Sequence, residues 1–115
     1  MSDAPVLTKT AVDDYAAADD FVKKHTPLID LRPAGEGKTT VVVTVGKEVP
    51  HPNAPDHYIG WIAILAGDSE VARFDLSAVA TDPQVSVLLS VDPGTTITAV
   101  ESCNLHGLYS HSVMI

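Results

Sequence analysis

The chain has 115 residues, of which 45% are hydrophobic and 19% charged, a composition typical of one globular domain rather than a disordered segment. Its 15 acidic residues outnumber its seven basic ones, and the net charge of -8 at pH 7 makes nucleic acid and anionic membranes unsuitable partners. No stretch is apolar for long enough to cross a bilayer, and the first residues lack the pattern of a signal peptide, so we expect a cytoplasmic protein.

Near the N-terminus, residues 13–24 combine several alanines with acidic residues first and lysines last. This order suits a short helix or turn, because it complements the helix macrodipole. We therefore divide the chain into an N-terminal segment, residues 1–20, and one folded domain, residues 21–115.

The rest of the chain is dominated by strand signals. Residues 28–31 form one short candidate, and β-branched or alternating runs follow at residues 39–45, 60–66, 70–76, 84–91, 95–101 and 107–114. Turn signatures separate several of these runs, and no helical pattern long enough for a parallel crossover intervenes. The sequence predicts an all-β fold: an immunoglobulin-like antiparallel β-sandwich of about seven strands with a short N-terminal helix or turn segment.

Two short stretches carry candidate metal ligands. The run from Cys103 to Gly107 reads as a tight turn that holds a thiol and the His106 imidazole three residues apart. With one cysteine in the chain an internal disulfide is impossible, so Cys103 is core filler, a nucleophile or a metal ligand. The loop from His51 to His57 contains two prolines, which stiffen it and can hold both imidazoles in place.

A further histidine, His25, lies upstream, so four of the five histidines and the cysteine can converge on one ion. The fifth, His111, sits within a predicted strand, where a lone histidine is usually a surface or hydrogen-bonded residue, and we leave it out of the site. Imidazoles and a thiolate suit iron, copper or zinc rather than calcium or magnesium. Five ligands exceed the tetrahedral preference of zinc and leave one octahedral position open, which favours a redox ion that meets a small ligand.

Three separated motifs resemble those of the superoxide reductase family. They are Lys24-His25-Thr26-Pro27, the loop from Gly46 through His51-Pro52-Asn53 to His57, and Cys103-Asn104-Leu105-His106-Gly107. The chain has no cysteines for a rubredoxin-type domain, so it is similar to the single-iron subclass, called neelaredoxin, and to the iron-binding domain of desulfoferrodoxin. The resemblance implies a superoxide reductase-like iron-binding β-sandwich with one non-haem iron (Fe2+/Fe3+) per chain, His25, His51, His57 and His106 as equatorial ligands and Cys103 as the axial ligand.

The resemblance also implies an activity. Members of this family are oxidoreductases that reduce superoxide to hydrogen peroxide without releasing oxygen, as a defence against oxidative stress. Lys24 matches the family lysine that holds a positive charge near the open site, so it is our catalytic candidate, whereas Lys47 reads as a solvated loop lysine. A rubredoxin-like electron donor and a homo-oligomer, tetramer or dimer, are further implications.

One position departs from the family pattern. Where members usually carry a glutamate two residues before the first histidine, this chain has Lys23, which cannot ligate iron while protonated. We expect water, hydroxide or an exogenous anion to cap oxidised iron, with Asp19 and Asp20 as candidate substitutes. The second lysine is also expected to raise the local positive potential. A smaller change is Tyr109, which replaces the usual tryptophan and is expected to pack near the site.

Three alternatives stay open at this point. Cys103, His106 and His51 also fit a cupredoxin, a copper electron carrier, although Met114 lies eight residues beyond His106 and two histidines would be idle. A non-catalytic sandwich that binds metal for stability is the second alternative. An iron-dependent superoxide dismutase is the third.

Overall fold

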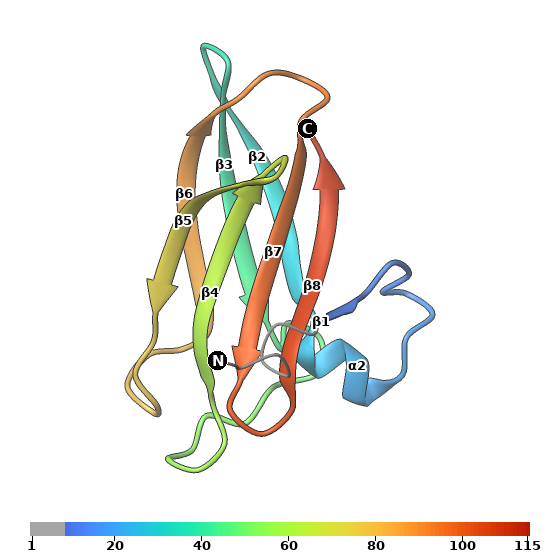
Figure 1. Ribbon diagram of the computed structural model, residues 1–115, viewed down its shortest axis with the longest axis vertical. Helices are drawn as coiled ribbons and strands as arrows, with labels where there is room; N and C mark the ends of the chain where they lie inside the picture. Colours follow the sequence, from blue (N-terminus) through green and yellow to red (C-terminus); the bar gives the residue numbers. More distant parts are fainter. Residues whose placement is uncertain (1–8) are drawn as a thin grey trace.

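The computed structural model describes residues 9–115, which form two packed β-sheets with one short helix at one end (Figure 1). One sheet has five strands in the order β1-β8-β7-β4-β5, and the other has three in the order β2-β3-β6. The elements are β1 (Lys9–Ala11), α2 (Asp20–His25), β2 (Pro27–Gly35), β3 (Lys38–Val45), β4 (Ile59–Ala66), β5 (Ser69–Asp75), β6 (Gln84–Ser90), β7 (Thr96–Cys103) and β8 (Gly107–Met114). The predicted β-sandwich with a short N-terminal helix is confirmed.

The strands follow the sequence patterns closely, with two differences. The short run at residues 28–31 belongs to a nine-residue strand, β2, and the other predicted strands begin and end within two residues of their predicted limits. Strand β1 was not predicted, and it pairs with β8 in parallel, whereas the other strand pairs are antiparallel. Its three residues are all exposed and carry no alternation, so its pairing depends on where the chain passes the sheet edge.

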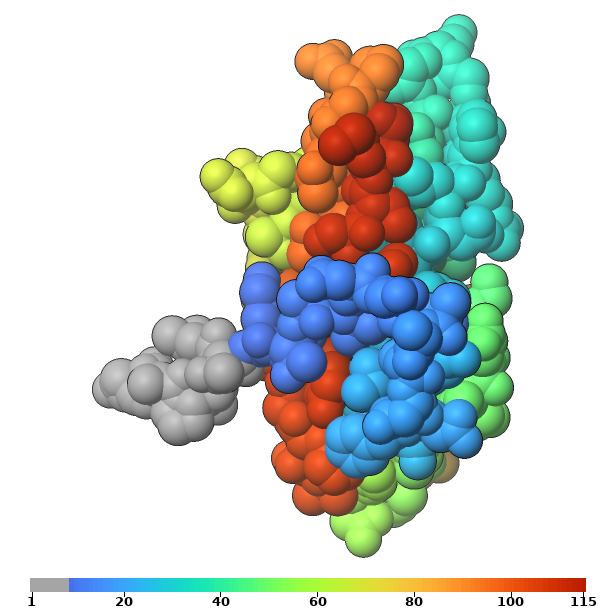
Figure 2. Space-filling model, turned by 90° about the vertical axis from the view of Figure 1, so that its right-hand side faces the viewer, coloured from blue at the N-terminus to red at the C-terminus, as the bar shows by residue number. Residues whose placement is uncertain are grey.

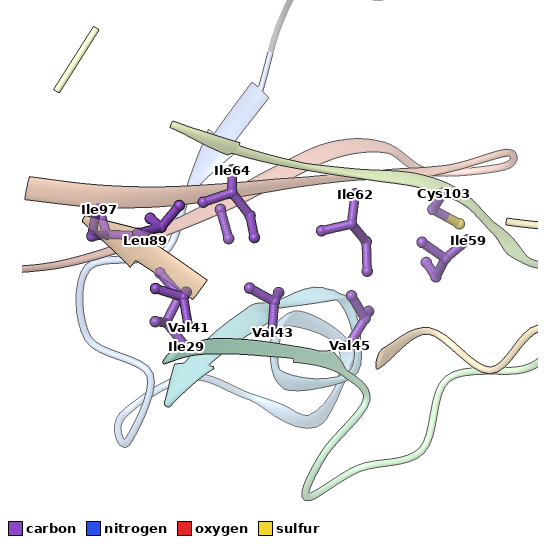
Figure 3. Close-up of a cluster of buried hydrophobic side chains, with 11 residues drawn as sticks. Ile29, Val41, Val43, Val45, Ile59, Ile62, Ile64, Leu89, Ile97 and Cys103 are labelled. Carbon is purple, nitrogen blue, oxygen red and sulfur yellow. The ribbon is translucent and has the colours of Figure 1, made fainter. Parts of the chain in front are cut away.

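The core lies between the inner faces of the two sheets. Alternate residues of β3 point inward, so Val41, Val43 and Val45 lie opposite the buried isoleucines of β4 (Figure 3). Val43 and Ile62 are both 0% exposed, and complete burial of such a side chain stabilises the fold by about 1.5–3 kcal/mol. Cys103 lies beside Ile59 at one end of this cluster, and Ile97 lies at the other end (Figure 3). The cysteine is therefore anchored in the core at one pole of the sandwich.

Helix α2 is shorter than the predicted segment, residues 13–24. It begins after Asp19, whose side chain accepts a hydrogen bond from the Val22 backbone N–H at 2.9 Å and so acts as the N-cap. Before it, the chain makes a turn at residues 16 and 17, where the Asp14 side chain accepts a hydrogen bond from Ala17 N–H. The predicted charge order holds, because Asp20 lies in the first turn and the basic residues lie in the last.

The segment before the helix packs on the sandwich. After β1, residues 12–25 run across the face next to β8 (Figure 2). Val12 is buried there and donates a backbone hydrogen bond to Ser110 at 2.8 Å. Within residues 9–115 no helix is long and apolar enough to span a bilayer. The boundary after residue 20 stays a prediction, and residues 1–8 lie outside the described part of the chain.

Candidate metal centre

Strand register brings the three histidine- and cysteine-bearing segments to one end of the sandwich. Pro27 at the start of β2 pairs with Val45 at the end of β3, so His25 and the loop that follows β3 lie side by side. Ile59 at the start of β4 pairs with Cys103 at the end of β7, which places the loop before β4 next to the thiol. The antiparallel arrangement therefore gathers segments that are up to 81 residues apart in the chain.

Four of the predicted ligands form a tight group. One ligand atom from each of His25, His57, Cys103 and His106 lies within 4.8 Å of all the others. Within this group, His25 Nε2 is 3.1 Å from His106 Nδ1, and Cys103 Sγ is 3.7 Å from the same Nδ1. Ligands on opposite sides of one ion lie about 4.2 Å apart when each metal–nitrogen bond is about 2.1 Å, so side-chain shifts of about 0.6 Å or less bring these four atoms onto a single metal ion.

The fifth predicted ligand, His51, lies beside this group rather than within it. Its ring centre is 4.9 Å from that of His25 and 4.7 Å from that of His57. Its Nε2 atom is buried and, among residues 9–115, has no hydrogen-bond partner, and the same is true of His57 Nε2. Buried polar nitrogens are normally paired, so these two atoms indicate a missing electron-pair acceptor such as a metal ion.

Backbone carbonyls select which nitrogen of two imidazoles is left for a metal. His25 Nδ1 is 2.7 Å from the Phe21 carbonyl oxygen, and His51 Nδ1 is 2.6 Å from the Pro52 carbonyl oxygen. A carbonyl only accepts, so each Nδ1 carries the proton and donates it. Each Nε2 then presents its lone pair, as a metal-binding histidine with a fixed tautomer does.

The electrostatic environment keeps these imidazoles neutral. Burial is the main cause that lowers the pKa of His51 to about 4; the Pro52 hydrogen bond opposes it, and the charges of His25, His57 and Lys24 add to it. Burial is also the main cause that lowers the pKa of His25. Neutral imidazoles at pH 7 are the form that binds metal ions.

Burial has an unfavourable effect on Cys103, because a thiol must lose its proton to bind a metal ion. Burial raises the pKa of Cys103, the charge of Glu101 raises it further, and the backbone N–H groups of Leu105 and His106 lower it. A bound cation overcomes this effect, since coordination deprotonates a thiol outright. Three imidazoles and a thiolate, with a fourth imidazole alongside, fit a borderline ion such as iron, copper or zinc.

The lysines near the site have different positions. Lys24 is half-buried and adjacent to His25 in the chain, and its charge is the smallest of the causes that lower the pKa of His25 and His51. Lys47 is exposed on the loop after β3, as predicted.

Lys23 lies 3.9 Å from Glu48, so its charge is compensated rather than added to the local potential as we had expected. Asp19 caps the helix, which engages one of the two carboxylates considered as substitute iron ligands.

Two aromatic rings pack on the ligand histidines. Tyr109 is buried and stacks on His25 with ring centres 4.9 Å apart, which confirms its predicted place near the site. Phe21 was not predicted to lie at the site. Its ring centre is 4.5 Å from that of His25 and 5.0 Å from that of His106. Its position four residues before His25 on α2 is the signal that could have revealed it, because such residues share a helix face.

A buried carboxyl group was also missed. Glu101 is 0% exposed, and within the described residues neither of its oxygens has a hydrogen-bond partner. Burial raises its pKa to about 9, so the group is protonated at pH 7. The alternation of β7 places residues 97, 99, 101 and 103 on one face, so the pattern around Cys103 was sufficient to place Glu101 inside.

Two further residues hold the ligand loops in position. Asn104 accepts a hydrogen bond from Tyr58 N–H at 2.8 Å and donates one to the Asp56 carbonyl at 3.0 Å, which ties the cysteine turn to the His57 loop.

Gly46 has a φ of +79°, and a Cβ added to it would lie 2.5 Å from His51 N. Neither contact was predicted, because the Asn104 bonds join segments that are 46 and 48 residues apart in the sequence, and the Gly46 contact depends on backbone angles.

The fold and this cluster define a class: a small β-sandwich protein with one mononuclear site built from histidines and a cysteine. Comparison with known proteins agrees, since the family model described as Desulfoferrodoxin matches residues 17–112. A superoxide reductase from Pyrococcus horikoshii is 33% identical over 104 residues, covering 81% of this chain and 88% of that protein. A neelaredoxin from Megalodesulfovibrio gigas is 32% identical over 120 residues, covering 87% and 92%.

Solved structures give the same result. The E12V variant of a superoxide reductase (neelaredoxin) from Archaeoglobus fulgidus, in the reduced form, is similar with a TM-score of 0.75 and 31% identity. The match covers 86% of this chain and 94% of that one. The chain belongs to the desulfoferrodoxin family.

Proposed function

We propose that this chain is a superoxide reductase, an oxidoreductase that reduces superoxide to hydrogen peroxide at one non-haem iron. The observation that carries the proposal is the convergence of the Cys103 thiol with three imidazoles within 4.8 Å, in a chain of the desulfoferrodoxin family. Relatives that match most of its length bear the names superoxide reductase and neelaredoxin.

In this proposal the iron is held by His25, His57, Cys103 and His106, with His51 as the fifth ligand. The unpartnered, buried Nε2 of His51 supports its inclusion, although it lies at the edge of the group. Iron bound by such ligands supplies one electron, which together with two protons converts superoxide to hydrogen peroxide. The soft thiolate makes the site electron-rich, in keeping with a reducing role.

The chain's own residues direct the anion to the site. Lys24 supplies a positive charge beside His25 and His51 on a protein whose net charge of -8 otherwise repels anions. The site reaches solvent on the side of His106, which is exposed, whereas His25 and Cys103 are buried. Superoxide can therefore arrive from the solvent side while the core side stays dry.

Each turnover consumes one electron, so a one-electron donor has to reduce the protein again. We propose a rubredoxin-like carrier as this donor, a homo-oligomeric assembly, tetramer or dimer, and a cytoplasmic location. These three proposals rest on the family resemblance and on the composition of the chain.

The proposal is tested by mixing reduced, iron-loaded protein anaerobically with a pulse of superoxide and following iron oxidation, peroxide and oxygen together. One peroxide formed per iron oxidised, without oxygen, is the expected result. Oxygen release would indicate a dismutase, and unchanged iron would indicate a structural metal. Preferential binding of copper with the absorption of a copper–thiolate bond would indicate an electron carrier.

A variant pair separates catalysis from stability. Cys103→Ser is expected to abolish peroxide formation, since a serine hydroxyl does not replace a thiolate ligand. Ala99→Ser places a hydroxyl on the same inner face of β7, at another buried position, and controls for the cost of burying it. If both variants lost stability equally and both still reduced superoxide, the Cys103 thiolate would not be a ligand that the reaction needs.

A further inference from the structure

Lys23 lies between two groups that come from different parts of the chain. Its Nζ atom is 5.5 Å from the centre of the Tyr15 ring, which belongs to the segment before α2. The same atom is 3.9 Å from Glu48 Oε1, on the loop that leads from β3 to His51. One ammonium group therefore joins the N-terminal segment, the helix and the His51 loop, which lie against one another at this end of the molecule (Figure 2).

Partial burial distinguishes this contact from an ordinary surface ion pair. The Lys23 side chain is 21% exposed, although the Glu48 side chain is 59% exposed. Tyr15 is half-buried, and burial together with the charge of Glu48 raises its pKa. An exposed ion pair alone contributes little to stability, but a cation held over an aromatic face with water partly excluded is attracted more strongly.

The two lysines of α2 therefore have different tasks. Lys24 precedes His25 directly in the chain, and in the proposed function its charge attracts the anion to the metal centre. The charge of Lys23 is directed to Glu48, three residues before His51. Lys24 thus attracts an anion, whereas its neighbour Lys23 holds a loop.

We propose that Lys23, Tyr15 and Glu48 form a latch that holds the loop of residues 46–51 against helix α2 and so positions His51. Gly46 anchors one end of this loop by its close approach to the His51 backbone, and the latch restrains its middle. All three latch residues are positioning residues, because they act on the site through His51. The inference rests on the proposed function in one respect, namely that His51 is a metal ligand.

Metal affinity separates a latch from a simple charge effect. If Lys23 and Glu48 acted only through their charges, removing the cation would strengthen binding of a metal cation and removing the anion would weaken it. A latch requires both partners, so loss of either one releases the loop. Both substitutions then weaken binding, and the double variant is no worse than the single ones.

The experiment titrates the metal-free chain of 115 residues with Co2+ and follows the absorption of the thiolate-to-cobalt charge transfer. Lys23→Gln and Glu48→Gln are each expected to raise the Kd up to about tenfold, the lower end of what loss of an outer partner of a metal ligand costs. The double variant is expected to match the single variants. Lys23→Arg keeps the cation, so it is expected to bind like the wild type, whereas Tyr15→Leu removes the ring and weakens binding.

A matched control comes from the Arg73–Glu70 pair. These side chains are 2.8 Å apart on β5, near the turn at the opposite end of the sandwich from Cys103. Glu70→Gln changes the net charge by the same amount as Glu48→Gln and is expected to leave Co2+ binding unchanged. The latch is refuted if the Kd for Co2+ changes in opposite directions in Lys23→Gln and Glu48→Gln, or if the two changes add in the double variant. It is also refuted if only one of the two variants, or neither, changes the Kd.

The outcome is distinguishable from failure of the proposed function. If the wild-type chain bound Co2+ without a thiolate signal, the proposed metal site would be wrong. The latch would then be judged by the urea midpoints of the wild type, the two single variants and the double variant. Non-additive midpoints support the contact between Lys23 and Glu48, and additive midpoints refute it.

Discussion

Gly46→Ala is the substitution for which the structure gives the sharpest expectation. Gly46 has a φ of +79°, where an alanine costs about 1–2 kcal/mol. An added Cβ would also lie 2.5 Å from His51 N, 3.1 Å from His51 Cβ and 3.3 Å from His51 Cα. Restoring an ordinary contact of 3.4 Å requires a shift of about 0.9 Å, and such overpacking typically costs a further 1–3 kcal/mol or so.

The shift falls on a predicted metal ligand, so it affects binding as well as folding. Ligand groups need to be held within about 0.5 Å of their working positions. We therefore expect Gly46→Ala to lower the free energy of unfolding by about 2–5 kcal/mol and to weaken Co2+ binding at least about tenfold. Urea unfolding of the metal-free chain and Co2+ titration measure these two effects.

Gly35→Ala is the matched control. Gly35 also has a φ of +79°, but no atom of the described chain would lie within 4 Å of an added Cβ, apart from its immediate neighbours. It ends β2 at the pole opposite the metal site, so only the backbone cost of about 1–2 kcal/mol is expected, with unchanged Co2+ affinity. If the two variants behaved alike in both assays, the close approach of Gly46 to His51 would have no role in positioning the ligand.

Three further predictions concern charge, loop restraint and pH. Lys24→Gln is expected to slow the reaction with superoxide about threefold to tenfold at low salt and less at high salt, as measured by pulse radiolysis. Lys47→Gln is expected to slow it much less. Equal effects of the two variants would show that Lys24 has no special position. Asn104→Ala removes two hydrogen bonds between the ligand loops, so urea unfolding is expected to show a loss of about 1–3 kcal/mol, and an unchanged midpoint would contradict this. The pKa of His51 is lowered to about 4 in the folded chain, against about 6.5 in the unfolded chain. As the pH falls from about 6.5 to 4, the unfolded chain therefore binds a proton at His51 that the folded chain does not. Up to about 3 kcal/mol of stability is lost over this pH range. His51→Gln is expected to reduce that pH dependence in the metal-free protein, and an unchanged profile would show that His51 is not protected from protonation.

The fold could be predicted because the strands carry their own signals. The run from Thr39 to Val45 is β-branched, and turn residues such as Asp92-Pro93-Gly94 mark where strands end. Strand β1 is the exception, since its three exposed residues have no pattern and its pairing depends on β8. The predicted helix or turn segment, residues 13–24, contains a turn and then helix α2, which begins after the N-cap Asp19.

The candidate ligands could also be identified from the sequence by itself, because residue type and spacing determine which side chains are able to bind a soft metal ion. Local sequence cannot specify what surrounds them, since the neighbours arrive through strand register. Only the tertiary structure places Glu48 against Lys23, which offsets a charge that the sequence suggested was free. It alone packs Gly46 on the His51 backbone. The chain's sequence thus determines the chemistry of the site, and long-range packing decides its geometry and its electrostatic balance.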